Sequence, residues 1–180
     1  MSFIINQSIN LSSSALKTIG LALFGSLVIA LSSQIAIPLE PVPVTLQTLT
    51  VMLIAIAYGP RLAGATILCY LFEGAIGLPV FANWQGGLPI LVGPHGGYLL
   101  GFLPAVLLTA CLLQQKLFSH YFMTLLAIFL GTACIYAAGI TYLTVLIGLD
   151  RAIKVGLLPF LGFELVKMMA LAYVAPKLHR

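Results

Sequence analysis

The chain has 180 residues, of which 61% are hydrophobic and only 7% are charged, and its mean hydropathy is +1.14. Soluble domains carry about a quarter charged residues, so this composition excludes a water-soluble globule and predicts one membrane domain spanning residues 1–180. The formal net charge is +4, but the lysines and arginines are scattered singly. This pattern argues against nucleic acid as a partner and leaves the lipid bilayer as the expected surroundings.

The apolar runs predict an all-α integral membrane protein with six transmembrane helices. Prolines 38, 41 and 43 end the first run, and Gly59-Pro60-Arg61 separates the second and third, which we expect to form a tight helical hairpin. A loop rich in glycine and proline follows from residue 77 to residue 96. The six helices are expected at about 15–35, 45–58, 62–76, 97–113, 121–147 and 157–174.

Six spans would place both termini on the same side of the membrane. Because short cytoplasmic loops retain Lys and Arg, the basic residues predict that both termini are cytoplasmic. A cleaved signal peptide is the alternative for the first run, although the leading fourteen residues carry no positive charge. The expected cytoplasmic side holds Lys17, Arg61, Lys116, Lys177 and Arg180, against Arg151 and Lys154 on the other side.

Ionisable groups inside a span are costly unless they pair or face a cavity. In the last apolar run, Glu164 and Lys167 stand three residues apart and therefore share one helical face. They could form a structural ion pair between helices. They could equally bind a small ligand of mixed polarity, with Lys167 meeting an acid group and Glu164 accepting N–H donors. Glu73 is alone in its span, so it lies at the interface, is protonated, or pairs with a residue not identified from sequence.

The loop at 77–96 is the second candidate for ligand contacts. Its glycines would let it close over a guest, with Phe81, Trp84 and Tyr98 as apolar walls and Asn83 and Gln85 as polar contacts. His95 lies in the same loop, where it is either a solvated side chain or a ligand contact. No P-loop lysine or dinucleotide spacing accompanies the glycines, which argues against nucleotide binding.

In the first apolar run, Ala22, Ser26 and Ala30 form a stripe of small residues at a spacing of four. Such a stripe lets another helix approach closely. It serves either internal packing or the docking of a partner.

Catalytic signatures are missing from the sequence, which has no GxSxG, no HExxH and no paired aspartates for a metal-diphosphate reaction. The three cysteines fit no zinc spacing. We therefore expect no enzyme, no metal site and no cofactor in this chain. There is also no ATP-binding signature, so active transport would draw its energy from other subunits.

Four segments resemble the BioY family, the biotin-binding S-components of energy-coupling factor (ECF) transporters. They are IPLEPVPVTLQTL at 37–49, GLPVFA at 77–82, GPHGGYLLGF at 93–102, and LPF at 158–160 leading into the helix of Glu164 and Lys167. The resemblance covers nearly the whole chain.

The resemblance implies a six-helix S-component in the bacterial cytoplasmic membrane, with a biotin pocket near the outer face. It also implies that the first helix docks on a membrane T-component attached to two ATPase subunits, with Ala22, Ser26 and Ala30 at the contact. Lys167 would pair with the valerate carboxylate of biotin, and Glu164 and Asn83 would bond its ureido ring. Further contacts would come from Tyr98, Gln47, Thr45, Trp84 and His95.

Three positions depart from the family pattern. Glu164 stands where aspartate is usual, His95 stands where the family has threonine in GPTGGY, and Glu40 occupies a site that is usually small or uncharged. These departures bear on the shape of the pocket and on substrate choice. Two alternatives therefore stay open from the sequence: a stand-alone vitamin facilitator, and a structural membrane subunit without a ligand.

Overall fold

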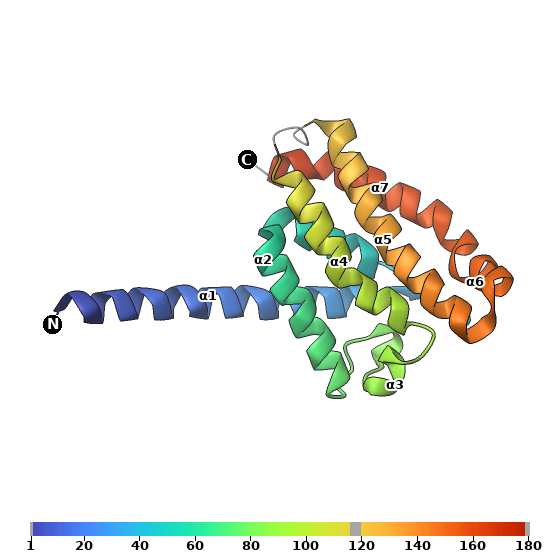
Figure 1. Ribbon diagram of the computed structural model, residues 1–180, viewed down its shortest axis with the longest axis horizontal. Coiled ribbons are helices and arrows are strands. Elements are labelled where there is room, and N and C mark those ends of the chain that lie inside the picture. Colours follow the sequence, from blue (N-terminus) through green and yellow to red (C-terminus); the bar gives the residue numbers. More distant parts are fainter. Residues whose placement is uncertain (1, 116–119, 179–180) are drawn as a thin grey trace.

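The computed structural model describes residues 2–115 and 120–178, and the fold is almost entirely helical (Figure 1). The long helices are α1 (Ser2–Ser33), α2 (Gln47–Ala75), α4 (Gly96–Leu113), α5 (Tyr121–Ile147) and α7 (Leu158–Leu178). The short elements between them are β1 (Ala36–Ile37), β2 (Val44–Thr45), η1 (Ala82–Trp84), α3 (Leu88–Leu91) and α6 (Leu149–Gly156).

Five helices within the described ranges are long and apolar enough to cross a membrane, namely Ala15–Ser33, Gln47–Ala75, Gly96–Leu113, Tyr121–Ile147 and Leu158–Ala175. Together with the hydrophobic composition, they make this a multi-pass membrane protein. The count of six spans and the side of the termini stay predictions. Two of the basic residues behind the orientation, Lys116 and Arg180, lie outside the described residues.

The second and third predicted helices are assigned as one element, α2, with a break inside it. Gly59 has φ 69° and ψ 172°, which is not helical, so two helical segments meet there at a kink. The predicted break at Gly59-Pro60 is therefore confirmed, but no separate loop joins the segments. Pro60 is tolerated because it lies in the first turn after the break, where its missing N–H leaves no helical bond unmade.

The proline-rich stretch after α1 forms a small antiparallel hairpin. Ala36 pairs with Thr45 and Ile37 with Val44 across it. The predicted second helix was therefore two residues too long at its start, because Thr45 lies in β2 and α2 begins at Gln47. Residues before proline avoid the helical region, and β-branched side chains suit an extended chain.

Glycines let the central helices approach one another. Helix α4 lies between α2 and α5 and packs against both, while α7 packs against α5 and α2 (Figure 1). A Cβ added at Gly101 of α4 would lie 3.0 Å from the Cβ of Ala138, and one at Gly131 of α5 would lie 1.9 Å from Oγ1 of Thr109. Only glycine permits this packing distance.

The stripe of Ala22, Ser26 and Ala30 faces the protein interior. All three residues are buried, and α1 packs with this face against α2. The Ser26 hydroxyl donates a hydrogen bond to Glu73 of α2, which identifies the partner that Glu73 lacked in the sequence. The predicted partner-docking role of the stripe is not confirmed, because α2 already covers it. The exposed face of α1 carries large apolar residues instead, among them Leu16, Leu23 and Leu27.

Helix α6 was not predicted from the sequence. It is short and strongly amphipathic, it begins after Gly148 at φ 84°, and its Lys154 pairs with Asp150 at 2.8 Å on the exposed face. Its buried face carries Ala152 and Gly156. Eight residues of mixed polarity cannot be distinguished from a loop by apolar runs alone.

Candidate functional site

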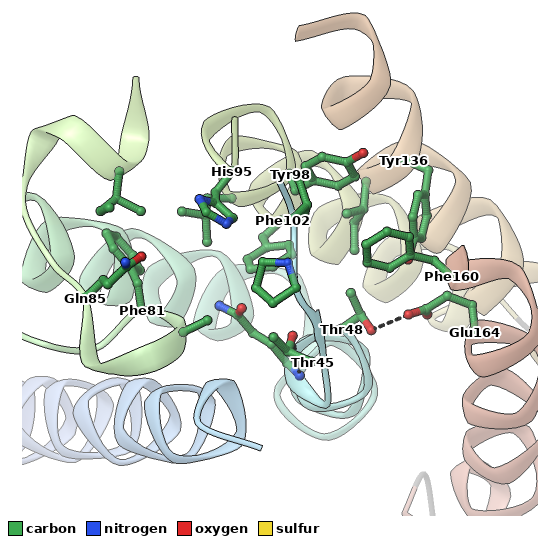
Figure 2. Close-up of a pocket in the computed structure, with 17 residues that line it drawn as sticks. Thr45, Thr48, Phe81, Gln85, His95, Tyr98, Phe102, Tyr136, Phe160 and Glu164 are labelled. Atoms are coloured by element: carbon green, nitrogen blue, oxygen red, sulfur yellow. Dashed lines mark hydrogen bonds between the residues drawn. The ribbon is translucent and has the colours of Figure 1, made fainter. Parts of the chain in front are cut away.

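A pocket opens among the hairpin, the start of α2, the loop before α4, and helices α4, α5 and α7 (Figure 2). It holds about 580 Å³ of space free of protein atoms, including the part open to solvent. Glu164, Tyr136 and Phe160 lie at one end of the view, and Gln85, Phe81 and His95 at the other. The lining is completed by Val42, Pro43, Thr45, Gln47, Thr48, Ala82, Ile90, Tyr98, Leu99, Phe102 and Ile135.

Glu164 and Lys167 form a buried ion pair at the base of this site. The Lys167 ammonium donates to Oε1 of Glu164 at 2.7 Å, and the residues are only 5% and 7% exposed. Glu164 lines the pocket whereas Lys167 does not. Lys167 also donates to the carbonyl of Thr45 at 2.7 Å and to Oγ1 of Thr48 at 2.9 Å. All three ammonium hydrogens therefore have acceptors within the protein.

Thr48 closes the polar cluster at the start of α2. Its hydroxyl accepts from Lys167 and donates to Oε1 of Glu164 at 2.8 Å (Figure 2). The cluster thus joins α7 to the hairpin and to α2 across a large separation in sequence. Its geometry fixes one carboxylate at the pocket wall with its charge balanced from behind.

Aromatic rings form the wall around that carboxylate. Tyr98 of α4 stacks on Phe160 of α7 with ring centroids 6.4 Å apart, and Tyr136 of α5 meets Phe160 edge-on at 5.8 Å. The Tyr98 hydroxyl donates to the carbonyl of Gly156 at 2.8 Å, which ties the ring to the end of α6. Such a wall suits a flat or bicyclic apolar ligand with polar edges.

Gln47 links the pocket to the loop that covers it. Its amide donates to the Tyr70 hydroxyl at 2.7 Å, and that hydroxyl donates to the carbonyl of Val80 at 3.1 Å. Phe81 follows in the loop, is 2% exposed, and packs edge-on against Tyr70 with centroids 5.5 Å apart. The pocket wall and the loop therefore share one hydrogen-bonded support.

His95 lies immediately before α4 and is partly buried at the pocket wall. Burial lowers the pKa of this imidazole below its ordinary value of 6.5. The side chain is consequently neutral near pH 7 and offers one donor and one acceptor instead of a cation.

Most of the residues predicted from sequence come together here. Glu164, Tyr98, Gln47, His95 and Thr45 line the pocket, as do Phe81 and Gln85. Three residues that were predicted to bind the ligand do not line the pocket. Lys167 lies behind Glu164, while Asn83 and Trp84 are exposed on the outside of the loop. Sequence reasoning did not single out Thr48, Phe102, Tyr136 or Phe160.

The missed residues left only weak signals. Thr48 falls one turn from Thr45 at the start of a predicted helix, which places both on the same face. The aromatic residues sit within apolar runs, where a pocket residue and a lipid-facing residue look alike. In the part of the chain that the structure describes, no group of three or more His, Cys, Asp or Glu residues could hold a metal ion.

Comparison with known proteins identifies the family. The family model described as the BioY family matches residues 6–180. This chain belongs to the BioY family. It is 39% identical over 154 residues to the biotin transporter BioY of Thermotoga maritima, covering 84% of this chain and 89% of that protein. It is 36% identical over 157 residues to a probable biotin transporter BioY of Pyrococcus horikoshii, covering 87% and 92%.

A solved structure has the same fold. The match is to the crystal structure of the S-component for biotin from an ECF-type ABC transporter, with a TM-score of 0.82 and 23% identity over 92% of each chain. This BioY chain therefore has the S-component fold and belongs among transporters, not enzymes. The predicted family is confirmed.

Proposed function

We propose that this protein captures biotin at the pocket beside Glu164 and serves as the substrate-binding subunit of an ECF-type importer. The observation that carries the proposal is a buried carboxylate fixed among aromatic walls, in a chain that shares 39% identity with a biotin transporter.

The polar groups of the pocket match the ureido ring of biotin. That ring offers two N–H donors and one carbonyl acceptor beside an apolar bicycle. Glu164 is placed to accept N–H groups, because Lys167 and Thr48 approach the same oxygen, Oε1, and hold the carboxylate in position. Tyr98, Tyr136 and Phe160 would cover the bicycle. Burial of this kind permits affinity on the order of nanomolar.

Lys167 is proposed to meet the valerate carboxylate of biotin. All three of its N–H groups already donate hydrogen bonds within the protein. To contact the ligand, the ammonium must therefore break one of these bonds, such as the one to the Thr45 carbonyl. Asn83 and Trp84 would reach the ligand only if the loop turned inward. These roles need separate tests from that of Glu164.

Isothermal titration of the purified protein with biotin and biotinamide tests the proposal. We expect tight binding of biotin and a loss of at least about a hundredfold in Glu164→Gln, because one carboxylate serves the ureido donors. Asp150→Asn is the matched control, since it removes the carboxylate of an exposed pair on α6. Biotin binding that is unchanged in Glu164→Gln would contradict the proposal.

Biotinamide isolates the role of Lys167. If the ammonium meets the valerate carboxylate, the parent discriminates biotin from the amide, and Lys167→Met loses that discrimination. Equal discrimination in both proteins would leave Lys167 as a support for Glu164 alone.

We further propose that the protein resides in the bacterial cytoplasmic membrane with both termini inside, needs no cofactor in this chain, and assembles with a T-component and two ATPases. Biotin uptake should then require those subunits. Uptake in cells that lack every energising subunit would instead support a stand-alone facilitator. If no ligand binds and replacement of both Glu164 and Lys167 by leucine leaves transport intact, the chain is a structural subunit.

A further inference from the structure

Residues 81–85 form a tight turn that contributes to the pocket from one side only. Phe81, Ala82 and Gln85 line the pocket, whereas Asn83 and Trp84 point outward, with Trp84 66% exposed. The backbone N–H of Phe81 donates to the carbonyl of Gln85 at 2.9 Å, which closes the turn. The wall of the pocket thus depends on the shape of the five-residue turn.

The tip of this turn has an unfavourable backbone. Asn83 and Trp84 both have φ of 58°, in the left-handed region. Asparagine tolerates this region, but a bulky residue such as tryptophan rarely adopts it. Such a conformation persists only where surrounding contacts hold it in place.

Gln34, which follows the last residue of α1, supplies those contacts. Its Nε2 donates to the carbonyl of Phe81 at 3.0 Å, and its Oε1 accepts the backbone N–H of Trp84 at 2.9 Å. One planar amide therefore bridges the two sides of the turn, as a neighbouring strand would. The same Nε2 lies 3.1 Å from the carbonyl of Ala30, which fixes Gln34 to the end of α1.

The neighbouring residue of α1 strengthens the attachment. The Ser33 hydroxyl lies 2.8 Å from the carbonyl of Val80 and is fully buried. The end of α1 and the turn are therefore joined at Val80, Phe81 and Trp84 in succession. Gln34 itself does not line the pocket.

We infer that Gln34 is a positioning residue for the ligand pocket, whose side-chain amide holds the left-handed turn at Asn83 and Trp84 so that Phe81 and Gln85 face the ligand. The inference rests on the proposed biotin site for its effect on binding. Its effect on the turn does not depend on any ligand. The two effects can therefore be measured separately.

Trp84 is the only tryptophan in the chain and lies within the turn, so its fluorescence reports on the turn directly. Without ligand, Gln34→Ala should increase the fast depolarisation of Trp84 in time-resolved anisotropy, because the amide no longer holds its backbone N–H. Ser32→Ala is the matched control: Ser32 is two residues away, and its hydroxyl donates to the carbonyl of Ile29 in its own helix. It should leave the anisotropy as in the parent.

Titration with biotin measures the effect on the pocket. We expect Gln34→Ala to weaken binding about tenfold or more, the loss that about two hydrogen bonds represent. Ser32→Ala should bind as the parent does. Adding Trp84→Gly to Gln34→Ala should recover part of the affinity, because glycine adopts positive φ without the strain of a side chain. A general folding defect would not be rescued by a change at the tip of the turn.

Unchanged Trp84 anisotropy in Gln34→Ala would overturn the inference, as would unchanged biotin affinity in a variant whose turn has become mobile. Failure of Trp84→Gly to restore any affinity would also count against it. A parent protein that binds no biotin would refute the proposed function, and the anisotropy alone would then decide whether Gln34 holds the turn.

Discussion

Lys167 and Glu164 hold each other in place one helical turn apart, with 2.7 Å between Nζ and Oε1 and both side chains buried. Lys167 also donates hydrogen bonds to the carbonyl of Thr45 and to the hydroxyl of Thr48, while Glu164 faces the pocket. The arrangement places one charged residue at the pocket wall and its counter-ion behind that wall. The pair is therefore both a structural link between α7 and the hairpin and the polar end of the site.

Removal of Lys167 should destabilise the protein strongly. Lys167→Met leaves the Glu164 carboxylate buried without its counter-ion, a change that costs about 3–5 kcal/mol in buried pairs. The double variant Glu164→Gln with Lys167→Met should recover much of the lost stability, because no uncompensated charge remains. The apparent melting temperature in detergent measures both effects.

Biotin titration of the same double variant separates structure from binding. We expect restored thermal stability without restored affinity, since the carboxylate is gone. Lys154→Met, which breaks only an exposed pair, is the control and should shift the melting temperature little. A double variant that regained both stability and affinity would mean that the pair serves only packing.

Gly139→Ala should damage the pocket without weakening the helix that carries it. A Cβ at Gly139 would lie 2.3 Å from Cδ1 of Tyr98, so the ring must move away from its place in the aromatic wall. Alanine favours a helix more than glycine does, so the expected loss of about 1–3 kcal/mol arises from overpacking alone. Biotin affinity should fall together with the melting temperature.

The control for this prediction is Gly162→Ala in α7, because a Cβ built there meets no described atom within 4 Å apart from its chain neighbours and the backbone of its own helix. It should keep full affinity and the same or a higher melting temperature. Equal effects at Gly139 and Gly162 would show that Tyr98 does not need its observed position.

The sequence predicted the central helices well because their ends carry strong signals. Helix α5 runs over Tyr121–Ile147, as predicted, and α4 begins one residue before its predicted start. The break at Gly59 was also located, since glycine before proline rarely continues a helix. The small helix α6 and the two short strands were missed, because neither has an apolar run long enough to stand out.

The sequence predicted Glu164 and the rings of Phe81 and Tyr98 at the site, but it missed Thr48 and the rings of Phe102, Tyr136 and Phe160 within the helices. In α5, Phe129 and Tyr136 are two turns apart and share a helix face, yet Phe129 is 51% exposed while Tyr136 lines the pocket. Hydrophobic periodicity shows which face of a helix a residue lies on, but it does not show which positions along that face line a pocket and which are exposed. Trp84 was placed in the pocket for its chemistry, but the left-handed turn directs it outward, and backbone conformation of that kind is not visible in the sequence.

His95 predicts a specific dependence on pH. Burial lowers its pKa below 6.5, so the imidazole is neutral in the folded protein at pH 7 and above. Titration of His95 should therefore not change the biotin affinity between pH 7 and pH 8. Below about pH 6.5 the unfolded state takes up a proton that the folded state resists, so stability should fall with acidification. Melting temperatures between pH 8 and pH 5 test this.

In His95→Gln, the part of the fall in melting temperature on acidification that comes from the imidazole should disappear. Glutamine keeps hydrogen-bonding groups but does not titrate. The remaining acid dependence belongs to the carboxylates and serves as the baseline. A melting temperature of the parent that instead rose on acidification, with the rise absent in His95→Gln, would mean that the imidazole is charged in the folded protein.

Thr48→Val should lower biotin affinity although Thr48 carries no charge. Valine keeps the shape of threonine, but it removes the group that accepts from Lys167 and donates to Glu164. An ammonium left with one fewer buried acceptor costs about 1–3 kcal/mol, and the carboxylate loses one of the bonds that orient it. We expect a drop of about tenfold in affinity, measured by titration.

Thr66→Val is the matched control on the same helix, because that buried hydroxyl donates to the carbonyl of Leu62 one turn earlier. Equal affinities of the two variants would show that the carboxylate keeps its orientation without Thr48.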